Sequence, residues 1–191
     1  EQILGIGIAA PGVVNTDTGT VLEYERIAGL SGYAIGAHFE QRFDAPVLVH
    51  NNASVIASSA YHYGAAQEEN SLLAVLVRSG VGGALITHGE VFLNGPATAL
   101  EIGRMRPFPD STESMESIVS EPAMLAILRE QFGVTSWSEA QHKLTIGQIQ
   151  PVLNRAAEVF AATLHNLHHL FHPEAILLIS RFSLLAEMLQ V

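Results

Sequence analysis

The stretch APVLVHNN, residues 45–52, couples a short apolar strand to a pair of amides. A helix-like run, 53–63, follows it, so Asn51 and Asn52 stand at the carboxyl end of the strand. In open α/β sheets, ligands bind outside the carboxyl ends of strands. Amides there can hydrogen-bond hydroxyl groups, but an amide has no useful pKa for accepting a proton. We therefore expect this edge to hold a polyol rather than to react with it.

Strands and helices alternate on both sides of this stretch. The patterns predict strands at 3–10, 20–25, 72–77, 84–87 and 175–179, and helices at 33–43, 115–132 (broken near Pro122), 137–143 and from near Pro151 to before Pro173. This order predicts mixed sheets with helices on their faces. A polar connection, 64–70, suggests lobes at 1–69 and 70–182, with a last helix, 183–191, returning to the first lobe.

Composition narrows the class of partner. The 191 residues are 48% hydrophobic and carry a formal net charge of -10 with nine Lys and Arg. Binding of a nucleic-acid backbone requires a positively charged surface, so we do not expect this segment to bind nucleic acid. The absence of cysteine excludes disulfides and thiolate metal sites. No apolar run reaches the ~18 residues of a membrane helix. We expect a soluble, cytoplasmic protein that is longer at both ends.

A glycine-rich segment, SGVGGA at 79–84, lies between two predicted strands. Ser79, Gly80, Gly82 and Gly83 would let backbone N–H groups approach a phosphate closely. The spacing is neither a dinucleotide fingerprint nor a Walker loop. The alternative is a β-hairpin whose glycines serve only the turn.

Charged residues follow in EIGR, 101–104, and at Glu116. Glu101, Arg104 and Glu116 can converge with the asparagine pair on one hydroxylated ligand, the alternative being surface charge on loops. The segment PGVVN, 11–15, closes the first strand. It places Gly12 at another carboxyl end, where ligand-contacting backbone is expected, although a plain turn is about equally compatible.

Four histidines gather near the end of the last long helix, at 165, 168, 169 and 172. Offsets of three, four and seven residues put them near one helical face. Neutral imidazoles at this spacing can bind zinc or nickel. No other ligand type is clustered nearby in the sequence, so we favour a solvated or interface face and predict no metal site.

Taken in order, these segments resemble the ROK family, which includes repressors, uncharacterised open reading frames and sugar kinases. Five segments resemble motifs of the family. The first three are GIGIAAPGVV (5–14) for G-I-x-x-P-G-x-V, VHNNAS (49–54) for E-N-D-A-N, and LVRSGVGGALI (76–86) for T-x-G-x-G-G-G-x-I. The other two are EIGR (101–104) for E-I-G-H and MESIVS (115–120) for L-E-x-x-A-S. The resemblance spans nearly the whole chain. It implies an actin-like, or ribonuclease-H-like, two-lobed ATPase fold with mixed sheets flanked by helices and a truncated N-terminal lobe.

The departures from the family pattern concern catalysis. In the family's kinases the aspartate of E-N-D-A-N is the general base, and here that position is Asn52. Losing a general base costs ~10²–10⁴ in rate. Arg104 replaces a histidine that binds sugar and zinc in many members, and residues 105–114 lack the cysteines of the family's zinc loop. Without those cysteines we expect no zinc. The turn SRFS, 180–183, lacks the glycines of the family, which should weaken nucleotide binding, so we expect no ATP.

The sugar contacts are better preserved. The resemblance implies sugar binding by Gly12, Asn51, Asn52, Glu101, Arg104 and Glu116, beside a degenerate phosphate segment. We therefore predict a sugar (or sugar-derivative) effector-binding domain of a ROK-type transcriptional regulator, without kinase activity. The alternatives are an ATP-dependent sugar kinase, active or degenerate, and a sugar-independent interaction module. Expected partners are the sugar, a second copy in a homodimer, and DNA only through a helix-turn-helix outside this chain; no membrane is expected.

Overall fold

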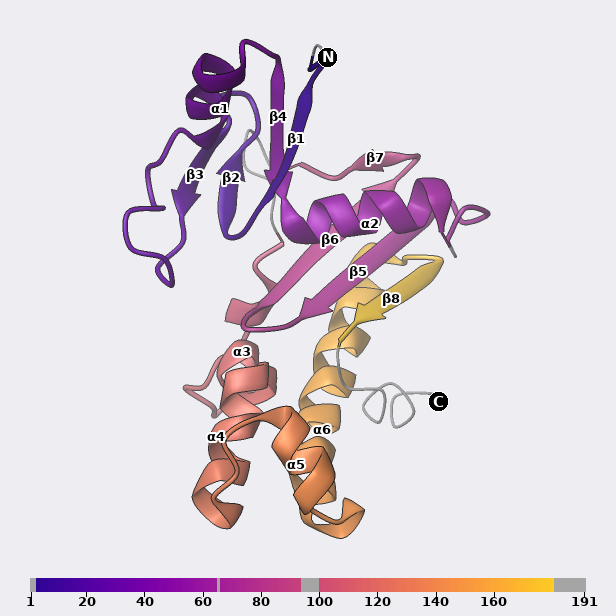
Figure 1. The fold of residues 1–191 in the computed structure, drawn as a ribbon. Coiled ribbons are helices and arrows are strands. Elements are labelled where there is room, and N and C mark those ends of the chain that lie inside the picture. The colour runs from indigo at the N-terminus through magenta and orange to yellow at the C-terminus, as the bar shows by residue number, and fades with distance from the viewer. Residues whose placement is uncertain (1–2, 65, 94–99, 181–191) are drawn as a thin grey trace. The chain divides into compact units, whose positions relative to one another are not determined.

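The computed structural model describes residues 3–64, 66–93 and 100–180. The described chain divides into two compact units (Figure 1). The first is drawn from Glu1–Ala74, Gly83–Leu100 and Glu174–Leu177, and the second from Val75–Gly82, Glu101–Pro173 and Leu178–Val191. The lobe limits inferred from the sequence, 1–69 and 70–182, stay predictions, and the expected helix at 183–191 lies outside the described residues.

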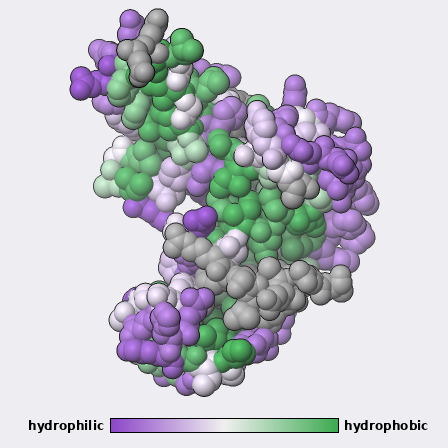
Figure 2. All heavy atoms as spheres, turned by 45° about the vertical axis from the view of Figure 1, so that its right-hand side comes forward, coloured by the Kyte–Doolittle hydropathy of each residue, from purple (hydrophilic) through white to green (hydrophobic). Residues whose placement is uncertain are grey.

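The first unit is built on a parallel pair of strands. β1 (Ile6–Ala10) pairs with β4 (Val47–Asn51), and the register sets Ala10 opposite Asn51. The carboxyl ends of both strands therefore meet at one edge. One face of the pair is buried at Ala10 and Val49, whereas Leu48 on the other face is 72% exposed. Figure 2 shows that hydrophobic residues reach the surface of the face that it displays.

The connection from β1 to β4 contains two short strands and a helix. β2 (Val13–Asn15) pairs antiparallel with β3 (Thr20–Glu23), and α1 (Ile35–Phe43) packs against β3 and β4. β2 is too short to give a periodic signal and was missed by the sequence patterns. Gly19 and Gly36 allow a close approach here: a Cβ on Gly19, whose φ is 61°, would lie 3.0 Å from the Gly36 Cα.

α2 (Asn52–Tyr63) begins directly after β4 and packs on β1, β4 and the short strand β7 (Glu90–Val91). A four-stranded sheet has the order β7-β6-β5-β8, where β5 is Ser71–Val77, β6 is Val81–Thr87 and β8 is Ala175–Ile179. β6 turns into β7 through His88 and Gly89, whose φ angles are 52° and 83°. Two positive φ angles are the mark of the hairpin turn that the sequence predicts.

The glycine-rich segment differs from its prediction. The strand expected at 84–87 begins three residues earlier, at Val81, so Gly82 and Gly83 belong to β6 rather than to a loop. The Gly83 amide donates to the Leu100 carbonyl at 3.2 Å, and the Leu100 amide returns the bond. Pairing with a distant residue therefore extends the strand through glycines that local propensity assigns to a turn.

Helices dominate the second unit (Figure 1). η1 (Ile102–Arg104), α3 (Met115–Val119), α4 (Glu121–Phe132), α5 (Trp137–Lys143) and α6 (Ile146–Phe171) follow in order. α3 and α4 both pack on α6, around buried Met115, Met124 and Phe160. The break near Pro122 is confirmed: Ser120 separates the two helices, and a proline is tolerated in a first turn.

α6 begins earlier than the sequence predicts. Its first residue is Ile146, five residues before Pro151, because Thr145 and Gln148 form a capping box that satisfies the first amides. Pro151 lies inside the helix, in its second turn, where it has no amide to donate to the carbonyl four residues earlier. None of the helices in the described part of the chain is long and apolar enough to cross a membrane.

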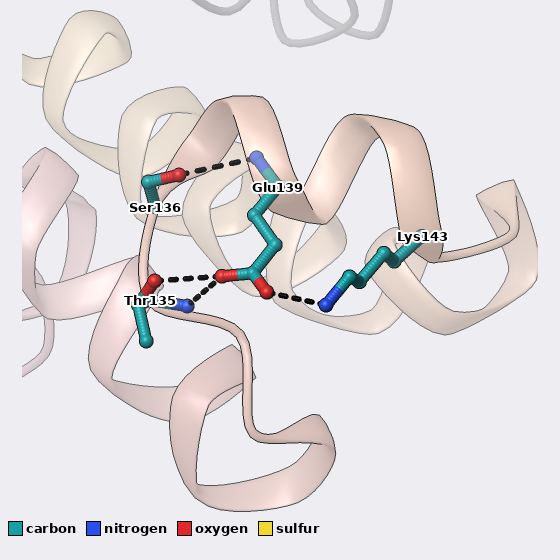
Figure 3. Close-up of polar contacts among 4 residues, drawn as sticks. All are labelled: Thr135, Ser136, Glu139 and Lys143. Carbon is teal, nitrogen blue, oxygen red and sulfur yellow. Dashed lines mark hydrogen bonds and ion pairs between the residues drawn. The ribbon is translucent and has the colours of Figure 1, made fainter.

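The start of α5 is fastened by one carboxylate (Figure 3). Glu139 accepts hydrogen bonds from the Thr135 amide and hydroxyl, each at 2.7 Å, and from Lys143 at 2.6 Å. Ser136 caps the helix by accepting from the Glu139 amide at 3.1 Å. The Lys143 ammonium and then the Thr135 groups lower the pKa of the Glu139 carboxyl from 4.5 to about 2.

Candidate functional site

Asn51 occupies the predicted edge but points inward. Its side chain is only 5% exposed. Oδ1 accepts from the amides of Ala53 at 2.8 Å and Ser54 at 3.4 Å, which makes Asn51 the N-cap of α2. Nδ2 donates to the Gly12 carbonyl at 2.7 Å. A primary amide has two N–H donors. One of them is used by the Gly12 carbonyl, which leaves the second Nδ2 hydrogen for a ligand.

Gly12 lies beside Asn51, as expected from the parallel pairing. Its φ is 79°, a backbone conformation that favours glycine. A Cβ at this position would overlap the Glu23 carbonyl oxygen. The glycine is therefore required by the closely packed β2–β3 ribbon, and its carbonyl is held in place by Asn51.

Asn52 is the first residue of α2 and is partly exposed. It stands directly after the carboxyl end of β4. Its amide can donate and accept hydrogen bonds, but it cannot remove a proton. The local geometry is thus compatible with hydroxyl recognition, and the sugar contacts proposed for Gly12, Asn51 and Asn52 stay predictions.

Glu116 has a structural contact that the sequence did not reveal. Its Oε2 accepts from the Val81 amide at 2.7 Å, so α3 is fastened to the first residue of β6. Gly103 lies under this bond: a Cβ there would be 3.2 Å from Glu116 Oε2 and 2.5 Å from the Val81 carbonyl oxygen. Gly103 therefore leaves room for the contact between Glu116 and Val81. The one sequence feature that pointed to it is its place inside the EIGR segment.

Glu101 and Arg104 form an ion pair at 3.0 Å between Arg104 Nε and Glu101 Oε2. The Arg104 side chain is 62% exposed and the Glu101 side chain 41%. An exposed pair of this kind contributes ~0–1 kcal/mol to stability. Both groups are therefore accessible from solvent, in contrast to Asn51.

The glycine-rich segment presents fewer amides than the sequence implies. The Val81 amide is engaged by Glu116, and the Gly83 amide by Leu100. The turn at Ser79 is closed by a bond from the Arg78 amide to the Gly80 carbonyl at 2.9 Å. A phosphate cradle requires N–H groups that point outward, and the phosphate role of Ser79, Gly80, Gly82 and Gly83 stays a prediction.

The candidate residues thus form two groups. Gly12, Asn51 and Asn52 belong to the first unit, and Glu101, Arg104 and Glu116 belong to the second. Within residues 3–64, 66–93 and 100–180, no group of three or more His, Cys, Asp or Glu is arranged to hold a metal ion. The glycine-poor turn expected at 180–183 lies outside the described residues after Ser180.

The whole chain, residues 1–191, matches the family described as the ROK family. The chain belongs to the ROK family. Its ROK relatives include both enzymes and repressors. It is 27% identical over 170 residues to a glucokinase of Halalkalibacterium halodurans, covering 85% of this chain and 50% of the relative. It is 26% identical over 211 residues to a putative xylose repressor of a Caldicellulosiruptor species, covering 98% of this chain and 53% of the relative.

A solved structure supports the fold. A ROK family transcriptional regulator, described as a homologue of the Escherichia coli MLC protein, superposes with a TM-score of 0.82 at 21% identity. The match covers 99% of this chain and 52% of that one. The actin-like ROK fold expected from the sequence is therefore confirmed. The chain spans about half the length of the curated relatives it matches.

Proposed function

We propose that this chain is the effector-binding domain of a ROK-type transcriptional regulator and that its effector is a sugar or sugar derivative. The observation that carries the proposal is Asn52, an amide at the carboxyl end of β4, where kinases of the family have their catalytic aspartate. The domain would hold hydroxyl groups without removing a proton from them. No ATP and no resident zinc would be needed for that task.

The regulator that contains this domain would act in the cytoplasm as a homodimer. A homodimer is proposed because regulators of that kind read two half-sites with paired recognition helices. The DNA contacts would come from a helix-turn-helix outside this chain. Effector binding would have to favour one of two conformations of the protein in order to change its affinity for DNA.

A second candidate is an ATP-dependent sugar kinase, supported by the similarity to a glucokinase. It requires another group to replace the missing base, such as Glu101 or a bound water. Arg104 bears on the ligand in either case, since a guanidinium fork suits carboxylate and phosphate groups. Sugar acids and sugar phosphates therefore belong in any ligand screen beside neutral sugars.

A thermal-shift screen tests the proposal. The chain is incubated with monosaccharides, amino sugars and sugar phosphates, each with and without Mg-ATP. We expect one sugar class to raise the melting temperature without ATP, because a ligand at a hundredfold excess over its dissociation constant adds ~2.7 kcal/mol to native stability. A shift that needs ATP, accompanied by ADP release, would instead establish the kinase.

Two matched variants separate sugar binding from general stability. Glu101→Ala removes a predicted sugar ligand, whereas Glu158→Ala removes a glutamate from a comparable exposed ion pair, with Arg155 at 3.4 Å. The sugar-induced shift should disappear in the first variant and persist in the second. Failure of every sugar to shift the wild-type chain would contradict sugar binding and favour the interaction module.

A further inference from the structure

The sequence alone favoured a solvated or interface face, and no metal site, for the histidines near the end of α6. The geometry of two of them favours the metal-binding alternative. His165 and His169 are one helical turn apart, and their ring centroids lie 4.5 Å from each other. Both side chains are exposed. We propose that His165 and His169 form a two-imidazole chelate for an exchangeable divalent transition ion of the zinc or nickel class.

The pair points away from the protein core. Leu167 lies two residues from each histidine and is only 3% exposed. Two residues correspond to about 200° around an α-helix, so the histidines project from the opposite side of α6. Neither imidazole is needed for packing, and both can turn their ring nitrogens toward an ion in solvent.

On this part of α6, imidazole nitrogens are the side-chain groups available as metal ligands. Residues 159–171 of α6 contain no Asp, Glu, Lys or Arg, so no carboxylate on this part of the helix offers hard oxygen ligands. Imidazole nitrogens suit zinc, copper and nickel, whereas magnesium and calcium prefer oxygen. The net charge of -10 adds a general attraction for cations.

The other two histidines are placed less favourably. His168 and His172 are also four residues apart, but their centroids are 5.8 Å from each other. His172 is the C-cap of α6, with φ at 44°, so it has left the helical register that aligns i and i+4 side chains. This difference assigns the chelate to His165 and His169.

Two protein ligands leave the remaining coordination positions to water. Among the described residues, no third His, Cys, Asp or Glu joins the pair to form a group that could hold a metal ion. The site would bind its ion weakly and reversibly. It is also separate from residues 105–114, where the zinc loop of the family would be expected, and it is independent of sugar binding.

Calorimetric titration of the metal-free chain with zinc chloride and nickel chloride tests the proposal. We expect one ion per chain, and no heat of binding with magnesium chloride. The variant His165→Ala/His169→Ala should bind at least ~10-fold more weakly. The matched variant His168→Ala/His172→Ala loses the same number of imidazoles and should retain wild-type affinity.

Two further measurements make the outcome independent of variant folding. Zinc should raise the melting temperature of the wild-type chain and of His168→Ala/His172→Ala, with reversal by EDTA, because chelation links two positions of one helical turn. In the wild-type chain, zinc should perturb the imidazole NMR signals of two histidines. The proposal is overturned if zinc at millimolar concentration does not bind, or if both double variants lose binding equally.

Discussion

At the residue scale, Asn51 joins two parts of the first unit. Its side chain caps α2 through Ala53 and Ser54 and holds the Gly12 carbonyl. We expect Asn51→Ala to lower the free energy of unfolding by ~2 kcal/mol, since it removes an N-cap and leaves a carbonyl without its partner. Urea unfolding measures the loss. The partly exposed neighbour provides the control: Asn52→Ala should cost no more than ~0.5 kcal/mol, and equal losses would contradict the assignment.

Glu116 shows the same principle in the second unit. The sequence identifies it as a sugar-contacting carboxylate by resemblance alone. The structure shows that one of its oxygens holds the Val81 amide, above a glycine that leaves no room for a side chain. Replacing Glu116 would therefore disturb the glycine-rich segment as well as any sugar contact. For this reason Glu101, which has no comparable buried contact, is the better residue for testing ligand binding.

At the scale of a single element, α5 is stabilised by Glu139. Since the pKa of this carboxyl is lowered from 4.5 to about 2 in the folded chain, its contribution is complete above pH 4.5 and is lost as the pH falls toward 2. Glu139→Gln should thus be less stable than the wild type at pH 7, and the difference should shrink between pH 4.5 and 2. Melting temperatures at a series of pH values measure this.

A control for that series is Glu130→Gln, which changes an exposed glutamate on α4. The variant removes one exposed carboxylate from α4, so it measures the effect of losing a single negative charge over the same pH range. If the two variants respond alike to acid, the effect belongs to the overall charge of the chain rather than to the Thr135–Lys143 contacts.

At the scale of the whole molecule, charge decides the partner. A net charge of -10, with nine Lys and Arg, opposes the release of counterions that drives DNA binding. We expect the 191-residue chain alone not to retard a labelled DNA duplex in a gel-shift assay, even at about 50 mM salt, where phosphate contacts are strong. Retardation that weakens with added salt would show that this chain contributes DNA contacts of its own.

Much of the fold was accessible from the sequence because its signals are local. Apolar runs gave most of the strands but missed β2, Pro122 gave the break between α3 and α4, and His88-Gly89 gave the hairpin turn. The ordered motifs gave the ROK family, and Asn52 gave the argument against kinase chemistry. The same local signals failed at Pro151, where a proline suggested a helix start that the capping box at Thr145 places earlier.

The sequence by itself thus determined the family, most of the order of the elements and the presence of an amide at position 52. Tertiary structure alone decided what Asn51, Glu116 and the glycine-rich segment do. Asn51 bonds to a residue 39 positions away, and Glu116 to one 35 positions away. Such partners depend on how the chain folds back on itself. A motif can therefore name a polar residue, but whether it faces a ligand or holds the backbone depends on contacts between distant segments.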